Sequence, residues 1–238
     1  MQKLKGNIFS FLGTSIFAFN FISMKVLVGL LEPKIIIFLR FSLAGIFTFL
    51  ILFLMNKNIK IKNRKDLVQL IITGFLGMSL YYIFFANSLK YISASLSSLI
   101  CSMIPIFTLL FDTIINKKSS KKLTKFLFLL SIFGVYLVID VNIHNDNFLN
   151  LIKGIVLMFL AIASWITYTI KAEQLLKKYN SLLVLGYQCI FGAAISSIFI
   201  LGQINTFKNI FNSPKAIIII LNILFVSLIA TILGYLFY

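Results

Sequence analysis

Residues 35–55 read IIIFLRFSLAGIFTFLILFLM, a run of 21 residues that carries one charge, at Arg40. About 20 apolar residues in a helix span the ~30 Å hydrocarbon layer of a membrane. The run does not alternate apolar with polar residues, and it is about twice as long as a membrane strand needs to be. Because backbone groups in lipid must be hydrogen-bonded within the segment, the run predicts a membrane-spanning helix.

The rest of the chain repeats this pattern. Of its 238 residues, 60% are hydrophobic and 12% are charged, which is too apolar for a water-soluble globule of this size and excludes soluble enzymes and disordered tails. Seven further apolar runs lie at residues 8–29, 67–89, 92–115, 124–141, 154–171, 182–202 and 216–238. The predicted fold class is therefore all-α, a polytopic membrane helical bundle of eight helices.

Basic residues mark the predicted turns. The chain has 22 Lys and Arg against 6 Asp and Glu, a formal net charge of +16. With a cytoplasmic N-terminus, the predicted inner segments hold 15 basic residues and the outer segments 6, and Arg40 lies within a span. Since cytoplasmic loops are enriched in Lys and Arg, we expect a multi-pass protein of the cytoplasmic (inner) membrane with its N-terminus inside. The positive charge then faces the anionic lipid bilayer, and no nucleic-acid partner is expected.

An internal repeat divides the chain into two regions. KGNIFSFL begins at Lys5 and KGIVLMFL at Lys153, 148 residues apart, and each opens an apolar block. The first block, residues 1–141, holds five predicted helices. Because five is an odd number, a second copy at residues 153–238 starts on the opposite side of the membrane. This predicts an inverted repeat whose second half is incomplete, with three helices.

One segment carries a family resemblance. FFANSLKYISASLSSLICSMIPIFTLL, from Phe84 to Leu110, combines an aromatic-Ala-x-x-x-Tyr segment with a Ser/Ala-rich helix and a proline. Supporting segments surround Asn20, Arg40, Gly134 and Trp165. In this order and spacing, over nearly the whole chain, the sequence resembles the EamA-like family of the drug/metabolite transporter superfamily.

The resemblance implies ten helices in two inverted five-helix repeats, and export or uptake of small metabolites through a central cavity. The sequence departs from the family at Phe17-Ala18, where the family has Trp-Gly, at Asn116, where a Glu is common, and in lacking the ninth and tenth helices. The expected function is a secondary transporter (permease) of a small organic metabolite that works by alternating access. The alternative is a non-transporting membrane protein, either a truncated remnant or a structural subunit.

Polar and aromatic side chains inside the predicted spans are the candidate solute ligands. Amides, phenols and charges within hydrocarbon need partners, so they turn toward protein, water or solute. Each of them alone also fits an interface belt or ordinary packing. The candidate substrate-binding residues are Asn20, Arg40, Tyr81, Tyr82, Asn87, Ser98, Pro105, Trp165, Tyr168, Tyr187 and Gln188.

Two of these candidates have specific alternatives. Arg40 lies about five residues into its span, so its guanidinium either snorkels to the outer interface or faces an outer vestibule, where it attracts anionic solutes. Ser98 belongs to a stripe of small residues that also suits a helix-packing seam. Pro105 removes one helical hydrogen bond, which predicts a kink in the fourth span.

Catalytic, metal and cofactor motifs are absent from the sequence, so no enzyme activity, metal or cofactor is expected. Cys101 and Cys189 are interpreted as packing residues, and His144 as a solvated loop residue. Asp112 and Asp140 lie near helix ends and are expected to reach water. The expected partners are a small-molecule solute and the lipid bilayer. A homodimer is an assembly that the sequence leaves open.

Overall fold

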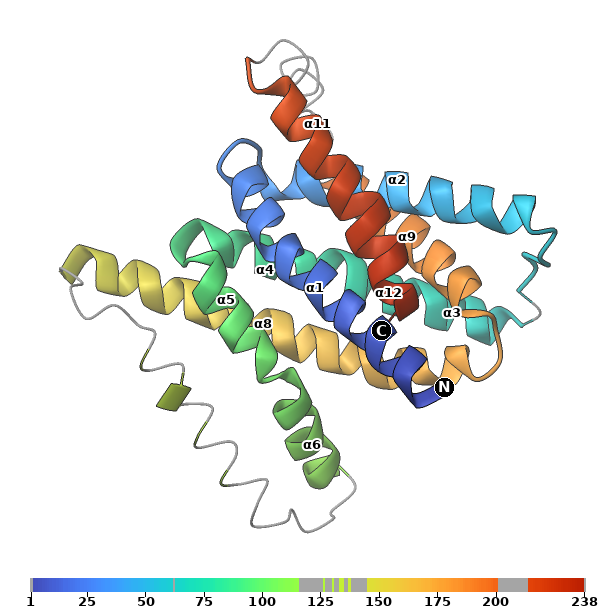
Figure 1. Cartoon of the computed structure of the whole chain (residues 1–238), viewed down its shortest axis with the longest axis horizontal. Helices are drawn as coiled ribbons and strands as arrows, with labels where there is room; N and C mark the ends of the chain where they lie inside the picture. Colours follow the sequence, from blue (N-terminus) through green and yellow to red (C-terminus); the bar gives the residue numbers. More distant parts are fainter. Residues whose placement is uncertain are drawn as a thin grey trace.

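The computed structural model describes residues 2–61, 63–115, 126, 130, 133–134, 137, 145–200 and 214–237, and every regular element among them is a helix. The elements, shown in Figure 1, are α1 (Gln2–Val28), α2 (Pro33–Leu54), α3 (Arg64–Thr73), η1 (Gly74–Leu80), α4 (Tyr81–Tyr91), α5 (Ala94–Ser102), α6 (Ile104–Ile115), α8 (Asn145–Leu176), α9 (Ser181–Ile198), α11 (Ala216–Leu224), η2 (Phe225–Leu233) and α12 (Gly234–Phe237). Both η1 and η2 are π-helical.

Six of the eight predicted spans are confirmed as helices long and apolar enough to cross a membrane. They are Phe11–Val28, Pro33–Leu54, Arg64–Tyr91, Phe148–Leu176, Ser181–Ile198 and Ala216–Leu233. The predicted span at 124–141 lies outside the described residues, apart from 126, 130, 133–134 and 137. The all-α class and the multi-pass membrane character are therefore confirmed.

The fourth predicted span, at 92–115, is not one helix. It breaks at Met103, where α5 ends and α6 begins. Pro105 is the second residue of α6, a position where its missing N–H breaks no helical hydrogen bond. The expected irregularity of the fourth span is therefore present, at Met103, where the backbone remains in the right-handed region (φ −78°, ψ −9°) as α5 gives way to α6.

Local sequence explains where the helices start and stop. Pro33 begins α2 with a backbone angle already suited to a helix. At the other end, Asn56 adopts a left-handed backbone (φ 50°), and the N–H groups of Asn56 and Lys57 bond the carbonyls of Phe53 and Leu52. This is a Schellman motif, which Asn tolerates better than most residues.

Three other helices begin at short polar side chains. Asn63 accepts a hydrogen bond from Lys65 N at α3, Ser93 from Leu96 N at α5, and Asn180 from Leu182 N at α9. A side-chain oxygen here satisfies a backbone donor that has no partner within the helix.

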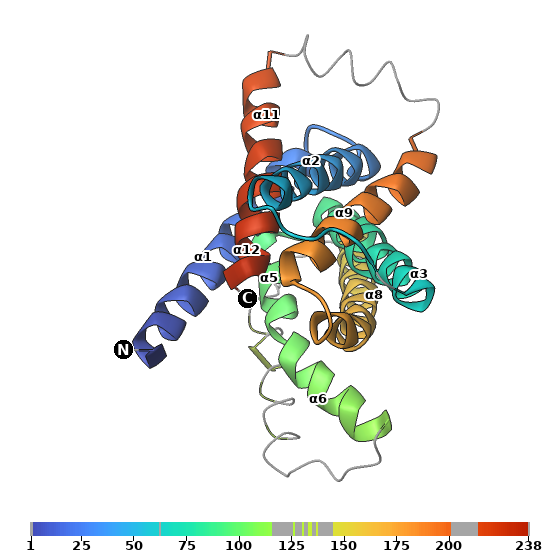
Figure 2. The same cartoon turned by 90° about the vertical axis from the view of Figure 1, so that its right-hand side faces the viewer.

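The helices of the two halves of the chain interleave. α2 packs along α9, α4 packs along α8, and α1 packs against η2 and α12. In both views α6 extends away from the other helices (Figures 1 and 2). Residues far apart in the sequence therefore enclose the same spaces.

Glycines allow the closest contacts. A Cβ atom built on Gly77 of η1 would lie 2.5 Å from the ring of Tyr168, and one on Gly192 of α9 would lie 2.5 Å from Met78 Cβ. In lipid, such small residues let helix backbones approach each other. The contact at Gly77 fixes the position of Tyr168, which belongs to the candidate site.

The connections between helices gather at two ends of the molecule. At one end, Lys25 Nζ at the end of α1 donates to the carbonyls of Leu89 and Ile92, the latter at 2.8 Å. At the opposite end, Asp66 at the start of α3 pairs with Lys178, which follows α8. The connections at residues 55–63 and 177–180, both predicted to lie on one side of the membrane, therefore share one end of the molecule.

Candidate functional site

A cavity of about 400 Å³ lies between α1, the start of α4, the α5–α6 break, α8 and α12. Its wall is largely aromatic and aliphatic, with a few amide and hydroxyl groups, which is the usual character of a small-molecule site. The lining residues are Thr14, Phe17, Ala18, Asn20, Phe21, Tyr81, Tyr82, Ser98, Cys101, Ser102, Ile104, Pro105, Trp165 and Tyr235. We call this space the first cavity.

Six of the eleven candidate residues lie in this wall. They come from five different elements and are Asn20, Tyr81, Tyr82, Ser98, Pro105 and Trp165. The Ser/Ala-rich α5 presents Ser98, Cys101 and Ser102 to the cavity, so this part of the stripe faces a space instead of forming a packing seam. The break before Pro105 opens the wall at this point.

A second cavity, of about 550 Å³, lies between the second half of α8 and the first half of α9. Its lining residues are Trp165, Tyr168, Thr169, Ala172, Glu173, Leu176, Ser181, Val184, Leu185, Gln188 and Tyr235. Two more candidates, Tyr168 and Gln188, are in this wall. Because Leu176 and Ser181 flank the 177–180 connection, the second cavity reaches that end of the molecule.

Trp165 and Tyr235 line both cavities and therefore lie between them. Their ring centroids are 5.9 Å apart in an edge-to-face arrangement. Trp165 also contacts Tyr81 at 4.8 Å on the side of the first cavity and Tyr168 at 5.0 Å on the side of the second. We call these rings, which lie between the two cavities, the aromatic partition.

Arg40 of α2 is fully buried, so the expectation that it snorkels to the interface is wrong. Its Nε donates to Thr231 Oγ1 of η2 at 2.9 Å, and a second guanidinium nitrogen donates to Asn20 Oδ1 at 2.9 Å. The guanidinium carbon lies 4.3 Å from the centre of the Tyr82 ring, a cation–π contact. Arg40 is not a lining residue of either cavity, but it contacts two residues of the first.

The charge of Arg40 has only neutral partners among the described residues. One of its terminal nitrogens is buried without a hydrogen bond. The described carboxylates pair elsewhere, Glu32 with Lys34 at 3.3 Å, Glu173 with Lys177 at 2.6 Å and Asp66 with Lys178 at 2.8 Å. A buried cation without an opposite charge is costly, so the protein retains it against a substantial desolvation penalty.

A second polar network joins Tyr168, Gln188 and Thr73 at the second cavity. Tyr168 OH donates to Gln188 Oε1 at 3.2 Å, and Gln188 Nε2 donates to Thr73 Oγ1 at 3.0 Å. Gln188 is 1% exposed and Thr73 is fully buried. This network is uncharged, and each side chain has at least one partner.

Two candidates point away from both cavities. Asn87 is half-buried and donates to the Ile83 carbonyl of its own helix at 2.8 Å. Tyr187 donates its hydroxyl to the Ile59 carbonyl at 2.9 Å and stacks on Phe191. Both therefore have structural partners, and neither contacts the space where the other candidates gather.

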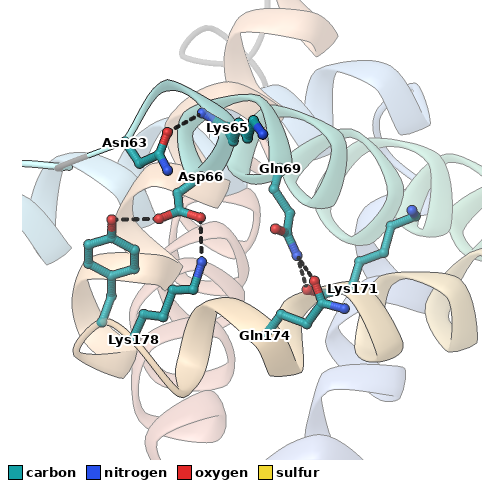
Figure 3. A network of polar contacts seen from close by, with 8 residues as sticks. Asn63, Lys65, Asp66, Gln69, Lys171, Gln174 and Lys178 are labelled. Atoms are coloured by element: carbon teal, nitrogen blue, oxygen red, sulfur yellow. Dashed lines mark hydrogen bonds and ion pairs between the residues drawn. The ribbon is translucent and has the colours of Figure 1, made fainter.

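A hydrogen-bonded clasp joins α3 to α8 at the end that carries the 177–180 connection (Figure 3). Asp66 accepts from Lys178 Nζ and Tyr179 OH, both at 2.8 Å. Beside it, Gln69 Nε2 donates to the Lys171 carbonyl at 2.6 Å and to Gln174 Oε1 at 3.2 Å. The hydrogen bond to Asp66, and then its charge, raise the pKa of Lys178.

No group of three or more His, Cys, Asp or Glu among the described residues is placed to hold a metal ion. Asp140, His144 and the predicted 117–125 turn lie outside the described residues, as does the side chain of Asp112. The described lining of the first cavity offers hydrogen-bonding groups, aromatic rings and the Cys101 thiol, with the positive charge of Arg40 nearby.

Comparison with known proteins identifies the family. The model of the EamA-like transporter family matches residues 4–140 and 152–238. An uncharacterized transporter of Archaeoglobus fulgidus is 26% identical over 216 residues, covering 91% of this chain and 72% of the relative. The uncharacterized transporter YyaM of Bacillus subtilis is 28% identical over 229 residues, covering 95% and 74%. No solved structure matches the chain significantly. The family is one of transporters and not of enzymes, and this membrane protein belongs to the EamA-like transporter family.

Proposed function

We propose that the protein is a secondary transporter that binds a small organic solute in the first cavity and exposes it to each side of the cytoplasmic membrane in turn. The observation that carries this proposal is the pair of cavities separated by Trp165 and Tyr235. Alternating access requires a solute site whose connection to each side of the membrane is closed in turn. The family supports transport in general, and the cavities support the proposal that the solute binds between these helices.

The proposal includes two inverted repeats, at residues 1–141 and 153–238. Their third apolar helices are each interrupted by a π-helical segment, η1 in the first half and η2 in the second. π-Helical segments are rare and often occur at functional sites. Paired interruptions at corresponding places in two halves are typical of transporters built from repeats.

Helix packing supports the same pairing. α9 packs against η1, and α2 packs against η2; α8 packs against η1, and α1 packs against η2. Each of these contacts to η1 therefore has a counterpart to η2 with the halves exchanged. The 148-residue spacing of Lys5 and Lys153 also relates Asn20 to Tyr168 and Arg40 to Gln188, so two of the three residues in each polar network correspond, which supports the pairing.

We further propose that the N-terminus is cytoplasmic. The distribution of basic residues, 15 in the predicted inner segments and 6 in the outer ones, supports this orientation. The end of the molecule with Lys177, Lys178 and the 55–63 connection then faces the cytoplasm. In this orientation the second cavity is an inner vestibule that leads toward the partition.

Transport by proteoliposomes tests the proposal. Purified protein is reconstituted, and counterflow is measured with radiolabelled organic acids, amino acids, amines and nucleosides. We expect counterflow of at least one solute to exceed that of protein-free vesicles, and Trp165→Ala to reduce it. Phe19→Ala is the matched control, because Phe19 is 60% exposed beside the cavity-lining Ala18 and is not in either cavity wall.

Two results would contradict the proposal. If no solute in the panel exchanges faster than in protein-free vesicles, a non-transporting membrane protein is the better account. If counterflow occurs but Trp165→Ala and Phe19→Ala are equally active, the transport pathway does not pass through the partition.

A further inference from the structure

Arg40 determines which way the Asn20 amide is turned in the wall of the first cavity. A guanidinium has five N–H donors and no acceptor, so the group of Asn20 that meets it must be the amide oxygen. The amide nitrogen of Asn20 is then left for other partners. Among the described residues, no acceptor is bonded to that nitrogen, and Asn20 lines the first cavity.

Asn20 therefore presents hydrogen-bond donors to the cavity, with a positive charge directly behind them. Donors backed by a cation are polarised and bind anionic acceptors more strongly than neutral ones. The low dielectric of this buried position preserves the attraction. Among the described residues that line the first cavity none is a carboxylate, so none of them competes for that charge.

We propose that the first cavity is selective for small organic monoanions with an apolar body, with the carboxylate at the Asn20 amide nitrogen and Arg40 as its counter-charge. The apolar body then contacts Phe21, Tyr81 and Trp165, the aromatic part of the wall. This assignment rests on the proposed transport function and adds to it the class of solute. It also explains why a buried Arg40 lacks a carboxylate partner among the described residues: the solute supplies one.

The wall favours a carboxylate over a phosphate. Apart from Asn20, the polar groups of the described lining are the hydroxyl groups of Thr14, Ser98, Ser102 and the tyrosines, the Trp165 indole N–H and the Cys101 thiol, and all of these are neutral. A phosphate carries up to two charges and three acceptor oxygens, and it is typically bound by several cations or a row of backbone N–H groups. One delocalised positive charge matches one carboxylate.

The competing explanation is that Arg40 only joins helices. It connects α2 to α1 through Asn20 and to η2 through Thr231, and such a connection needs no ligand. The two explanations differ for the substitution Asn20→Asp. This change places a carboxylate permanently beside Arg40. The connection between the helices is kept, but Arg40 is neutralised and no longer offers its positive charge to the solute.

The test uses Trp165, the single tryptophan of the chain, as a fluorescence reporter in both cavity walls. Protein in nanodiscs is titrated with three acid and amide pairs of equal shape: propionate and propionamide, isovalerate and isovaleramide, phenylacetate and phenylacetamide. Phenethylamine serves as the cation. We expect at least one acid to bind about tenfold or more tightly than its amide, as loss of one charge-assisted contact implies, and the amine to bind least.

The variants separate the two explanations. Arg40→Gln and Asn20→Asp should both abolish the preference for the acid over its amide, and Arg40→Lys should retain part of it. Asn20→Asp should also unfold at a temperature at least as high as the unchanged protein, because it neutralises a buried cation. The proposal is overturned if no acid binds more tightly than its amide, or if Asn20→Asp keeps the preference.

Counterflow with the same compounds separates this inference from the proposed function. Acid-selective binding without counterflow would remove the transport proposal and leave the anion site intact. Counterflow of amides or amines as fast as that of acids would remove the anion site and leave the transporter intact.

Discussion

In each of the two polar networks at the cavities, a central side chain is hydrogen-bonded to residues of two other helices, but only the first network carries a charge. At the first cavity, Arg40 of α2 joins Asn20 of α1 to Thr231 of η2. At the second, Gln188 of α9 joins Tyr168 of α8 to Thr73 at the end of α3. The proposed repeat exchanges the halves of the chain, so that Asn20 corresponds to Tyr168 and Arg40 to Gln188.

The threonines behave alike in both networks. Thr231 donates its hydroxyl to the Val226 carbonyl, and Thr73 donates to the Gln69 carbonyl, so each can accept a hydrogen bond from the central residue. In the second network each donor atom, Tyr168 OH, Gln188 Nε2 and Thr73 Oγ1, bonds at least one acceptor of this chain. In the first network one terminal nitrogen of Arg40 and the amide nitrogen of Asn20 have no described acceptor. A network that is complete within the protein holds helices together, whereas an incomplete, charged one is suited to a solute.

We expect Trp165→Ala to have the largest effect, because removal of this side chain should join the two cavities and so abolish the difference between them. Trp165 is half-buried and contacts Tyr81, Tyr168 and Tyr235. We expect unfolding to become easier by about 3 kcal/mol, the lower part of the range for removing a large aromatic side chain. Vesicles should also become leaky to the solute, since the partition no longer separates the two spaces. Thermal unfolding and passive efflux measure the two effects. Tight vesicles with this variant would show that the rings are not the barrier.

Arg40→Gln sharpens the comparison by making both networks neutral. We expect acid transport to fall by about 30- to 100-fold, which corresponds to losing a charge-assisted contact worth about 2–3 kcal/mol. The free energy of unfolding should change by no more than about 1 kcal/mol, because replacing a buried cation by a neutral group is often not destabilising. Counterflow and thermal unfolding are measured on the same preparation, with Phe19→Ala alongside. A large loss of stability with normal acid transport would assign Arg40 a structural role.

Gln188→Leu makes the matching change in the neutral network. Tyr168 then loses its acceptor while it remains 8% exposed, which should cost about 1–2 kcal/mol in the free energy of unfolding. The acid-over-amide preference should remain, since the charge lies at the other cavity. Denaturant unfolding and the Trp165 titration measure the two quantities. Loss of the acid preference in this variant would mean that both networks act on the solute.

Asp66→Asn should have the smallest effect, because the clasp of Figure 3 lies at the end of the helices and Lys178 is 56% exposed. Its pH dependence has a definite sign. The pKa of Lys178 is raised in the folded protein, so the pair contributes stability below the usual lysine pKa and loses it as the pH rises through the raised value. The melting temperature of the unchanged protein should therefore fall more steeply above about pH 10.5 than that of Asp66→Asn. Parallel curves would show that the pair contributes nothing.

The helices were largely predictable from the sequence because hydropathy over about 20 residues is a strong signal. Asn20, Tyr81, Tyr82 and Trp165 were predicted as lining residues for a related reason, since polar or amphipathic groups in hydrocarbon turn toward protein or cavity. Hydropathy gives the depth of a residue but not the direction in which its side chain points. Asn87 also lies within an apolar span, yet its amide donates to the Ile83 carbonyl of its own helix.

Hydrogen-bond partners that lie far apart in the sequence could not be predicted from local sequence patterns. Thr231 lies 191 residues from Arg40 and sits in an apolar run where a single threonine is unremarkable, so their hydrogen bond could not be read from the sequence. Tyr235 was missed for a similar reason, although its neighbours GYLFY resemble the aromatic cluster at Tyr81 and Tyr82. Aligning the third helices of the two halves would have suggested it. The burial of Arg40 was also missed, because its partners come from three separate parts of the chain.

The most direct test asks whether a transported solute occupies the first cavity. Cys101 lines that cavity, and Cys189 is fully buried in α9, so the two natural cysteines form a reporter and its internal reference. Alkylation of each by N-ethylmaleimide is followed by mass spectrometry in nanodiscs, with and without a saturating organic acid. We predict that the acid slows alkylation of Cys101 several-fold and leaves Cys189 unchanged. Alkylation of Cys101 at the same rate, with an acid that the vesicles demonstrably transport, would contradict the account.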